Sequence, residues 1–107
     1  MTTLYSKMGM KVKLLKINPG SRTSLQYHRD KREDMYVVSG TPLIELGLHS
    51  TDVESNAHVR IGFGVYHRIT NIGLSPLEII EVSTTMSGNE PDEQDIVRVR
   101  DDYGRES

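Results

Sequence analysis

The sequence predicts an all-β protein that folds as a sandwich or a closed barrel. About eight short segments combine apolar and polar residues in the alternation typical of strands, and turn signals separate them at near-regular spacing. No segment shows a convincing helical period. A length of 107 residues suits one domain and falls short of the roughly 150 at which a second would be considered. We therefore expect a single domain over residues 1–107, with the barrel core at about 10–100 and a charged tail at 101–107.

The first expected strand spans about residues 11–17, where Val12, Leu14 and Ile17 lie among three lysines. The lysines are expected to cover an outer face, and the Asn-Pro-Gly run at 18–20 is a strong turn signal that ends the strand. Two polar stretches, 49–56 and 84–94, are expected to be loops, the second of them mobile. The remaining strands are expected at residues 24–28, 33–39, 43–48, 57–61, 67–71, 76–83 and 95–100.

The composition excludes several classes of function. Thirteen basic and fifteen acidic side chains give a net charge of -2, which argues against a general nucleic-acid binder. The N-terminus has no apolar signal-peptide core, and no apolar run is long enough to span a bilayer. We therefore expect a cytoplasmic protein with no membrane partner. Because the chain contains no cysteine, any metal site must use nitrogen and oxygen ligands.

The stretch at 20–40 concentrates side chains that can bind a metal. Gln26 and His28 are two residues apart, so in a strand both project from the same face. Glu33 shares strand parity with the apolar Met35 and Val37, which places its carboxylate toward the core. A carboxylate that faces a core needs a partner.

The missing partner is expected downstream, where a turn containing Gly62 and Gly64 leads into His67. His67 shares parity with Ile69 and should also point inward. One amide oxygen, two imidazoles and one carboxylate make a plausible ligand set for a divalent transition metal, with room for water or substrate. The alternative is an empty polar pocket. The predicted metal ligands are Gln26, His28, Glu33 and His67.

Both stretches resemble the motifs of the cupin superfamily. In the first motif all spacings hold, with Gln26 in place of the first histidine. In the second motif, Gly62 replaces a proline and Asn56 stands where the motif usually begins with glycine. The residues that carry the resemblance are Gly20, Gln26, His28, Glu33 and Gly40 in the first motif, and Gly62, Gly64, His67 and Asn71 in the second. The resemblance implies a double-stranded β-helix, that is, a jelly-roll barrel with a mouth in which these side chains meet.

Within the cupins, the chain from about Val12 onward resembles the type II mannose-6-phosphate isomerase domain. The matching segments are at 24–28, 67–68, 76–82, 95–98 and 101–105. In larger members this domain follows a mannose-1-phosphate guanylyltransferase, whereas here we expect it to stand alone, without guanylyl transfer. The chain departs from the family in its segment at 4–9, in having Asp34-Met35 after the glutamate, in the run at 84–91, and in containing no tryptophan.

The resemblance implies an isomerase that interconverts an aldose and a ketose phosphate, with mannose 6-phosphate or a similar phosphosugar as substrate. One divalent metal would act as a Lewis acid that polarises the sugar oxygens and stabilises an enediolate. Zinc is the first choice, with manganese, iron, cobalt and nickel as alternatives. A base must also move a proton; the candidates are Lys31, a carboxylate such as Glu45, and metal-bound hydroxide.

Basic side chains could hold the phosphate of such a substrate, because guanidinium and ammonium groups bind phosphate oxygens. Lys31, in the motif turn, and Arg105, which matches the family tail, are the preferred candidates. His49 and His58 are expected to be structural or surface residues, and the acidic run at 90–95 is expected to be a solvated loop.

Two other functions remain open. A cupin could keep the metal and serve as a sugar-binding or regulatory module, or it could be a small metal-dependent oxygenase that uses two histidines and one carboxylate. We also expect a homodimer. The side chains expected to point away from the metal pocket, and so available to this contact or to packing between the sheets, are Leu25, Tyr27, Tyr36 and Val38.

Overall fold

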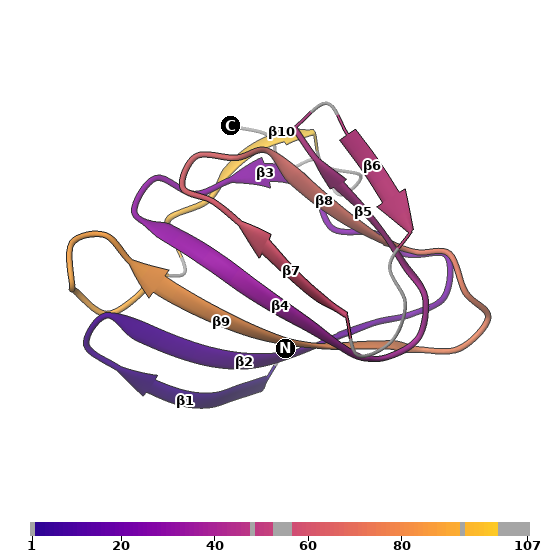
Figure 1. Ribbon diagram of the computed structural model, residues 1–107, viewed down its shortest axis with the longest axis horizontal. Helices are drawn as coiled ribbons and strands as arrows, with labels where there is room; N and C mark the ends of the chain where they lie inside the picture. Colours follow the sequence, from indigo (N-terminus) through magenta and orange to yellow (C-terminus); the bar gives the residue numbers. More distant parts are fainter. Residues whose placement is uncertain (1, 48, 53–56, 93, 101–107) are drawn as a thin grey trace.

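The computed structural model describes residues 2–47, 49–52, 57–92 and 94–100; the expected tail at 101–107 lies outside them. The described part contains ten strands and no helix (Figure 1). No helix long and apolar enough to cross a membrane occurs in this part. The strands are β1 (Thr2–Lys7), β2 (Met10–Ile17), β3 (Leu25–Tyr27), β4 (Lys31–Ser39), β5 (Pro42–Leu46), β6 (His49–Asp52), β7 (His58–Ile61), β8 (His67–Asn71), β9 (Leu77–Thr85) and β10 (Val97–Arg100).

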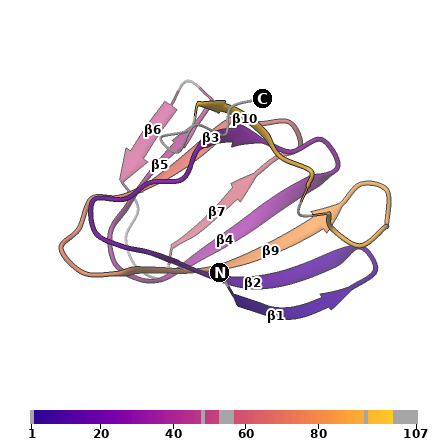
Figure 2. The same ribbon diagram turned by 180° about the vertical axis from the view of Figure 1, so that it is seen from behind.

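The strands form two five-stranded antiparallel sheets that lie face to face (Figures 1 and 2). The first sheet has the order β1-β2-β9-β4-β7, and the second has the order β10-β3-β8-β5-β6. Strands far apart in sequence are neighbours in both sheets, for example β2 with β9 and β3 with β8. This arrangement confirms the predicted all-β jelly-roll barrel.

Most strand positions agree with the sequence prediction, and β8 has the predicted bounds. Two strands were not predicted. The polar β1 pairs with β2 through a hairpin at Met8 and Gly9, and β6 lies in a stretch predicted to be a loop. Both are edge strands, held by backbone hydrogen bonds on one side only, so they need no apolar alternation.

The core lies between the sheets and is formed by aliphatic side chains from both. The first sheet contributes from β4, β7 and β9, and the second contributes Ile44 and Ile69. Met35 and Val37 point inward from β4 while Tyr36 and Val38 are exposed on its outer face, as the predicted strand parity requires. The dimer contact expected on that outer face stays a prediction. The buried core residues are Met35, Val37, Ile44, Ile61, Ile69, Leu77 and Ile79.

The inner face of the first sheet changes from apolar to polar along the strands. At one end Leu15, Ile79 and Val37 lie side by side on β2, β9 and β4. Two residues further along β2, its inward position is Lys13, which lies beside Glu81 of β9. Beyond that row, Lys11, Ser83 and Glu33 lie side by side. The same three strands therefore form part of the core and one wall of a polar region.

The prediction that the lysines of β2 cover an outer face is wrong for Lys13. Its side chain is 4 % exposed, and its Nζ lies 3.5 Å from Oε1 of Glu81. The segment has aliphatic residues on both faces, so its pattern does not decide which face is buried. The structure places Leu15 and Ile17 against the core, and Lys13 has the same parity as these two residues.

An ionic cluster covers the outer face of β4 and β7. His58 Nε2 and Arg60 Nε lie 2.8 and 2.9 Å from the same oxygen of Asp34, and the His58 ring stacks on Tyr36. Burial would raise the pKa of Asp34, but the hydrogen bonds from Arg60 and His58 hold it below its ordinary value. His58 is therefore a surface residue beside Arg60, as expected from the sequence.

The two glycines that bound the first motif allow a test of the fold. Both have positive φ, +78° at Gly20 and +98° at Gly40, but only at Gly40 would a Cβ meet backbone, at 2.9 Å from Cα of Leu77. Gly20→Ala should lower the free energy of unfolding by about 1 kcal/mol through backbone strain, and Gly40→Ala by about 3 kcal/mol or more. Urea denaturation measures both. Equal losses would show that the approach of Gly40 to Leu77 has no energetic consequence.

Candidate metal centre

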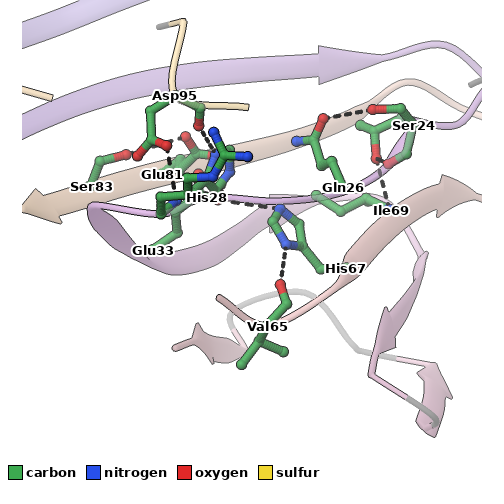
Figure 3. A network of polar contacts seen from close by, with 12 residues as sticks. Ser24, Gln26, His28, Glu33, Val65, His67, Ile69, Glu81, Ser83 and Asp95 are labelled. Carbon is green, nitrogen blue, oxygen red and sulfur yellow. Dashed lines mark hydrogen bonds and ion pairs between the residues drawn. The ribbon is translucent and has the colours of Figure 1, made fainter. Parts of the chain in front are cut away.

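Three buried side chains converge between the two sheets. His28 follows β3, Glu33 lies in β4 and His67 begins β8, and they are 4, 2 and 1 % exposed (Figure 3). One donor atom from each lies within 4.8 Å of the other two. Oε1 of Glu33 is 2.7 Å from Nε2 of His28 and 3.3 Å from Nε2 of His67.

Local structure explains how each group reaches this point. Glu33 faces inward because it shares parity with Met35 and Val37 in β4. His67 points inward with Ile69 at the start of β8. The carbonyl of His28 accepts a hydrogen bond from the backbone amide of Gly64, at 3.0 Å, so the two sequence motifs are joined directly beside the cluster.

The Nδ1 atoms of both imidazoles contact peptide carbonyls, at 2.6 Å from Asp95 O and 3.0 Å from Val65 O. A carbonyl oxygen only accepts hydrogen bonds, so each Nδ1 carries the hydrogen, and a neutral ring then presents a lone pair at Nε2. Carbonyl contacts of this kind are typical of histidines that bind metals.

The three donor atoms that point at one another carry lone pairs or negative charge, and no positive charge from the described residues lies between them. Nε2 of His28, Oε1 of Glu33 and Nε2 of His67 are buried without a hydrogen-bond partner among the described residues. A proton on one imidazole would satisfy part of this set, whereas a cation between the three groups satisfies all of them at once. Two imidazoles and a carboxylate suit zinc, iron and related transition metals. The described residues thus form a cluster that could hold a divalent metal.

The carboxylate of Glu33 has a lowered pKa, which favours its charged form. Burial alone would raise this pKa, but the contacts with His28, His67 and Glu81 hold it well below its ordinary value. The opposite holds for Glu81, whose pKa is raised well above its ordinary value by burial, then by the charge of Glu33 and the hydrogen bond with it. The nearby charges of Lys13 and Lys31 lower the pKa of Glu81 only in part. A raised pKa favours the protonated form of Glu81, which is the form that can donate a hydrogen bond to the Glu33 carboxylate.

Sequence reasoning did not identify Glu81 or Lys13 as part of this region. Glu81 was grouped with the apolar strand around it, although it has the parity of the buried Ile79 and Ser83. A charged residue at an inward position of a strand was the signal that could have identified it. The same signal, in β2, applies to Lys13.

Gln26, the fourth predicted ligand, lies opposite His67 in the β3–β8 pair. Its Oε1, the atom that would bind a metal, accepts a hydrogen bond of 2.6 Å from Oγ of Ser24, and Figure 3 shows the amide directed at that hydroxyl. The structure thus brings His28, Glu33 and His67 together and directs the Gln26 oxygen elsewhere. A ligand role for Gln26 stays a prediction.

The other predicted site residues have different placements. Lys31 is not in a turn: it begins β4, shares parity with Glu33 and is 2 % exposed. Glu45 lies opposite Arg68 in the β5–β8 pair and has the opposite parity to the buried Ile44, so it faces away from the metal cluster. Arg105 and its predicted contact with phosphate lie outside the described residues.

Asn71, the last residue of the second motif, has a structural role. Its Nδ2 donates to the carbonyls of Ile17 and Ser75, at 2.8 and 2.9 Å, and its Oδ1 accepts from the amide of Gly73. These bonds tie the end of β8 to the end of β2, and the buried amide is not directed at the metal cluster.

Comparisons with known proteins agree with this fold. The family described as "Mannose-6-phosphate isomerase C-terminal" matches residues 2–101. Xanthan biosynthesis protein XanB of Xanthomonas campestris is 43 % identical over 94 residues, which are 88 % of this chain and 20 % of that protein. Mannose-1-phosphate guanylyltransferase 2 of Escherichia coli O157:H7 is 36 % identical over 96 residues, 90 % of this chain and 19 % of that protein. The chain thus spans about a fifth of the length of these relatives.

Solved structures support the same architecture. A protein with a double-stranded β-helix domain from Klebsiella pneumoniae has a TM-score of 0.74 at 17 % identity, covering 83 % of this chain and 78 % of that one. The cupin domain of Cnp3 from Schizosaccharomyces pombe has a TM-score of 0.78 at 11 % identity, covering 80 % of this chain and 64 % of that one. At these identities the likeness concerns the fold alone.

Replacing either convergent histidine should abolish tight metal binding. His28→Ala or His67→Ala removes one of three donors, so we expect affinity for zinc to fall at least about 100-fold, more than the loss of an outer-shell partner costs. The melting temperature should fall only modestly because the apolar core is unchanged. His58→Ala, on the outer face of β7, is the matched control and should bind as the unmodified protein does. Unchanged metal content in both ligand variants would contradict the assignment.

Proposed function

Because the chain belongs to the family of mannose-6-phosphate isomerase C-terminal domains, matched over residues 2–101, we propose that it is a metal-dependent isomerase of an aldose phosphate. Mannose 6-phosphate and fructose 6-phosphate are the first pair to test. The observation that carries the proposal is the buried convergence of His28, Glu33 and His67, with donor atoms that lack hydrogen-bond partners in the described part of the chain.

Three side chains would hold the metal, namely His28, Glu33 and His67. When bound, a divalent cation supplies Lewis acidity toward the oxygens of a sugar. Glu33 contributes the negative charge, and the hydrogen bond from Glu81 helps to fix the direction of its carboxylate. The imidazoles are held by their Nδ1 contacts with peptide carbonyls, which leaves Nε2 available.

Buried lysines favour an anionic substrate. Lys13 of β2 and Lys31 of β4 both lie on the inner face near Glu81 and are 4 and 2 % exposed. Two ammonium groups beside a metal cation would make this end of the barrel positive, which attracts a phosphorylated sugar.

Isomerisation also requires a group that moves a proton between the two adjacent carbons of the sugar. Lys31 is our candidate, since it faces inward two residues before Glu33.

One observation favours a second chemistry. The convergent set consists of two histidines and one carboxylate, which is the set that non-haem iron oxygenases use. A metal-binding module without catalysis is the third possibility, because the chain departs from the family in its segment at 4–9, in Asp34-Met35 and in containing no tryptophan.

Elemental analysis followed by an isomerase assay separates these possibilities. We expect about one equivalent of metal per chain, and conversion of mannose 6-phosphate to fructose 6-phosphate that chelation abolishes and added zinc, manganese or cobalt restores. His58→Ala should keep this activity, and His67→Ala should lose it. Metal without turnover would exclude the isomerase and leave the module or the oxygenase; no metal under any condition would exclude all three.

Arg105 provides a separate test of phosphate recognition. Arg105→Ala should raise KM for a phosphosugar by about 10-fold or more, the effect of losing a hydrogen bond between charged groups. The Michaelis constant for the unphosphorylated sugar should change little, and kcat should change less than KM. If both sugars are affected equally, Arg105 does not bind phosphate.

A further inference from the structure

Asp95, in the segment just before β10, holds three consecutive residues of the first motif. Its carboxylate accepts two backbone hydrogen bonds, from Arg29 to Oδ1 and from Asp30 to Oδ2, each 2.8 Å long. Its own carbonyl oxygen lies 2.6 Å from Nδ1 of His28 (Figure 3). The sequence prediction assigned this acidic run to a solvated loop; Asp95 does lie outside the strands and is partly exposed, and its carboxylate and its carbonyl are both engaged.

These contacts determine two properties of the His28 ring. The carbonyl of Asp95 requires hydrogen on Nδ1, which leaves the lone pair on Nε2, and it also sets the direction of the ring. The carboxylate fixes the distance between the two segments, because it binds both amides that directly follow His28. Loss of the carboxylate would free the Asp95 backbone to move away from the imidazole.

The two histidines of the cluster differ in how they are held. Nδ1 of His67 contacts the carbonyl of Val65, only two residues away, so this ring is oriented within its own turn. His28 is oriented by a residue 67 positions away in sequence. His28 also lies outside the regular strands, just beyond β3, where no ladder of hydrogen bonds fixes its backbone.

We propose that Asp95 is a positioning residue that sets the tautomer and orientation of His28 and thereby raises the affinity of the site for a divalent metal. The inference rests on the metal site of the proposed function, but not on the sugar substrate. The proposal predicts that His28 is oriented for metal binding only when the segment before β10 packs against residues 28–30. The orientation of His67 should not depend on that segment.

The test compares Asp95→Ala and Asp95→Asn with Asp92→Asn. Asp92 is the matched control, since it lies in the same segment and, among the described residues, its side chain accepts from the amide of Gln94, at 2.9 Å. The first measurement is the ¹⁵N spectrum of the imidazoles in metal-free protein. We expect hydrogen on Nδ1 of both His28 and His67 in the unmodified protein, a mixture of tautomers at His28 alone in Asp95→Ala, and no change in Asp92→Asn.

The second measurement is affinity for zinc and for cobalt, with the visible absorption of bound cobalt as a report on ligand geometry. Asp95→Ala should weaken binding by about 10- to 100-fold, the usual effect of removing an outer-shell partner. Asp95→Asn, which keeps one acceptor oxygen, should weaken it less, and Asp92→Asn should leave it unchanged. The Asn variant also decides the question if Asp95→Ala does not fold, because a change at His28 without a change at His67 is not expected from general destabilisation.

The proposal is overturned if His28 carries hydrogen on Nε2 in the unmodified protein, if the tautomer and the affinity persist in the Asp95 variants, or if Asp92→Asn has the same effects. Failure of the proposed function looks different. An unmodified protein that binds metal but does not isomerise sugars leaves this inference intact. If it binds no metal, the proposal that Asp95 raises metal affinity is overturned as well, and the ¹⁵N spectra show whether Asp95 still orients the ring.

Discussion

A single buried charge, the carboxylate of Glu33, determines how the polar half of the barrel is arranged. It is 2 % exposed on the inner face of a sheet, and desolvation of an ion in such a place costs several kcal/mol unless it is compensated. The contacts with His28, His67 and Glu81, which hold the pKa of Glu33 low, offset part of this cost. Two buried lysines add positive charge nearby, and a divalent metal would complete the neutralisation. Buried groups with shifted pKa values of this kind are concentrated at functional sites.

The same strands that carry this charge also form the hydrophobic core. Along β2, β9 and β4 the inward rows are apolar at one end and polar at the other, with Met35 at the boundary. The site is therefore built on paired strands rather than on loops, which fixes the positions of Glu33 and Glu81 to the accuracy of the sheet. His28 is the exception, and contacts from distant segments replace the missing ladder.

Membership of the isomerase family and the geometry of the site support different parts of the proposal. The three convergent donors explain why a metal would bind, whereas the sugar and the reaction come from the resemblance to larger proteins of which this chain spans about a fifth. Two of the departures from the family are directed away from the donors. The segment at 4–9 belongs to the exposed β1 and its hairpin, and Asp34, in place of the histidine that commonly follows the glutamate, forms ion pairs on the outer face.

The sequence by itself determined the all-β fold, most of the strands, and the inward direction of His28, Glu33 and His67. These follow from local rules, since a period of two fixes which residues share a face and glycine spacing marks the turns. The sequence also correctly identified His58 as a surface residue. The family resemblance linked the two motifs, and the fold brings them together through the bond between Gly64 and His28.

Only the tertiary structure decided which face of β2 is buried and that Glu81 lies against Glu33. It also decided that Ser24 engages the amide of Gln26 and that Asp95 holds His28. In β2 both faces carry aliphatic residues, so the neighbouring strand β9 settles the choice. Glu81 is 48 positions from Glu33 in the sequence, and Asp95 is 67 positions from His28. No local sequence pattern encodes contacts over such separations. The direction of an amide such as Gln26 depends on the nearest donor, which is known only when the chain has folded.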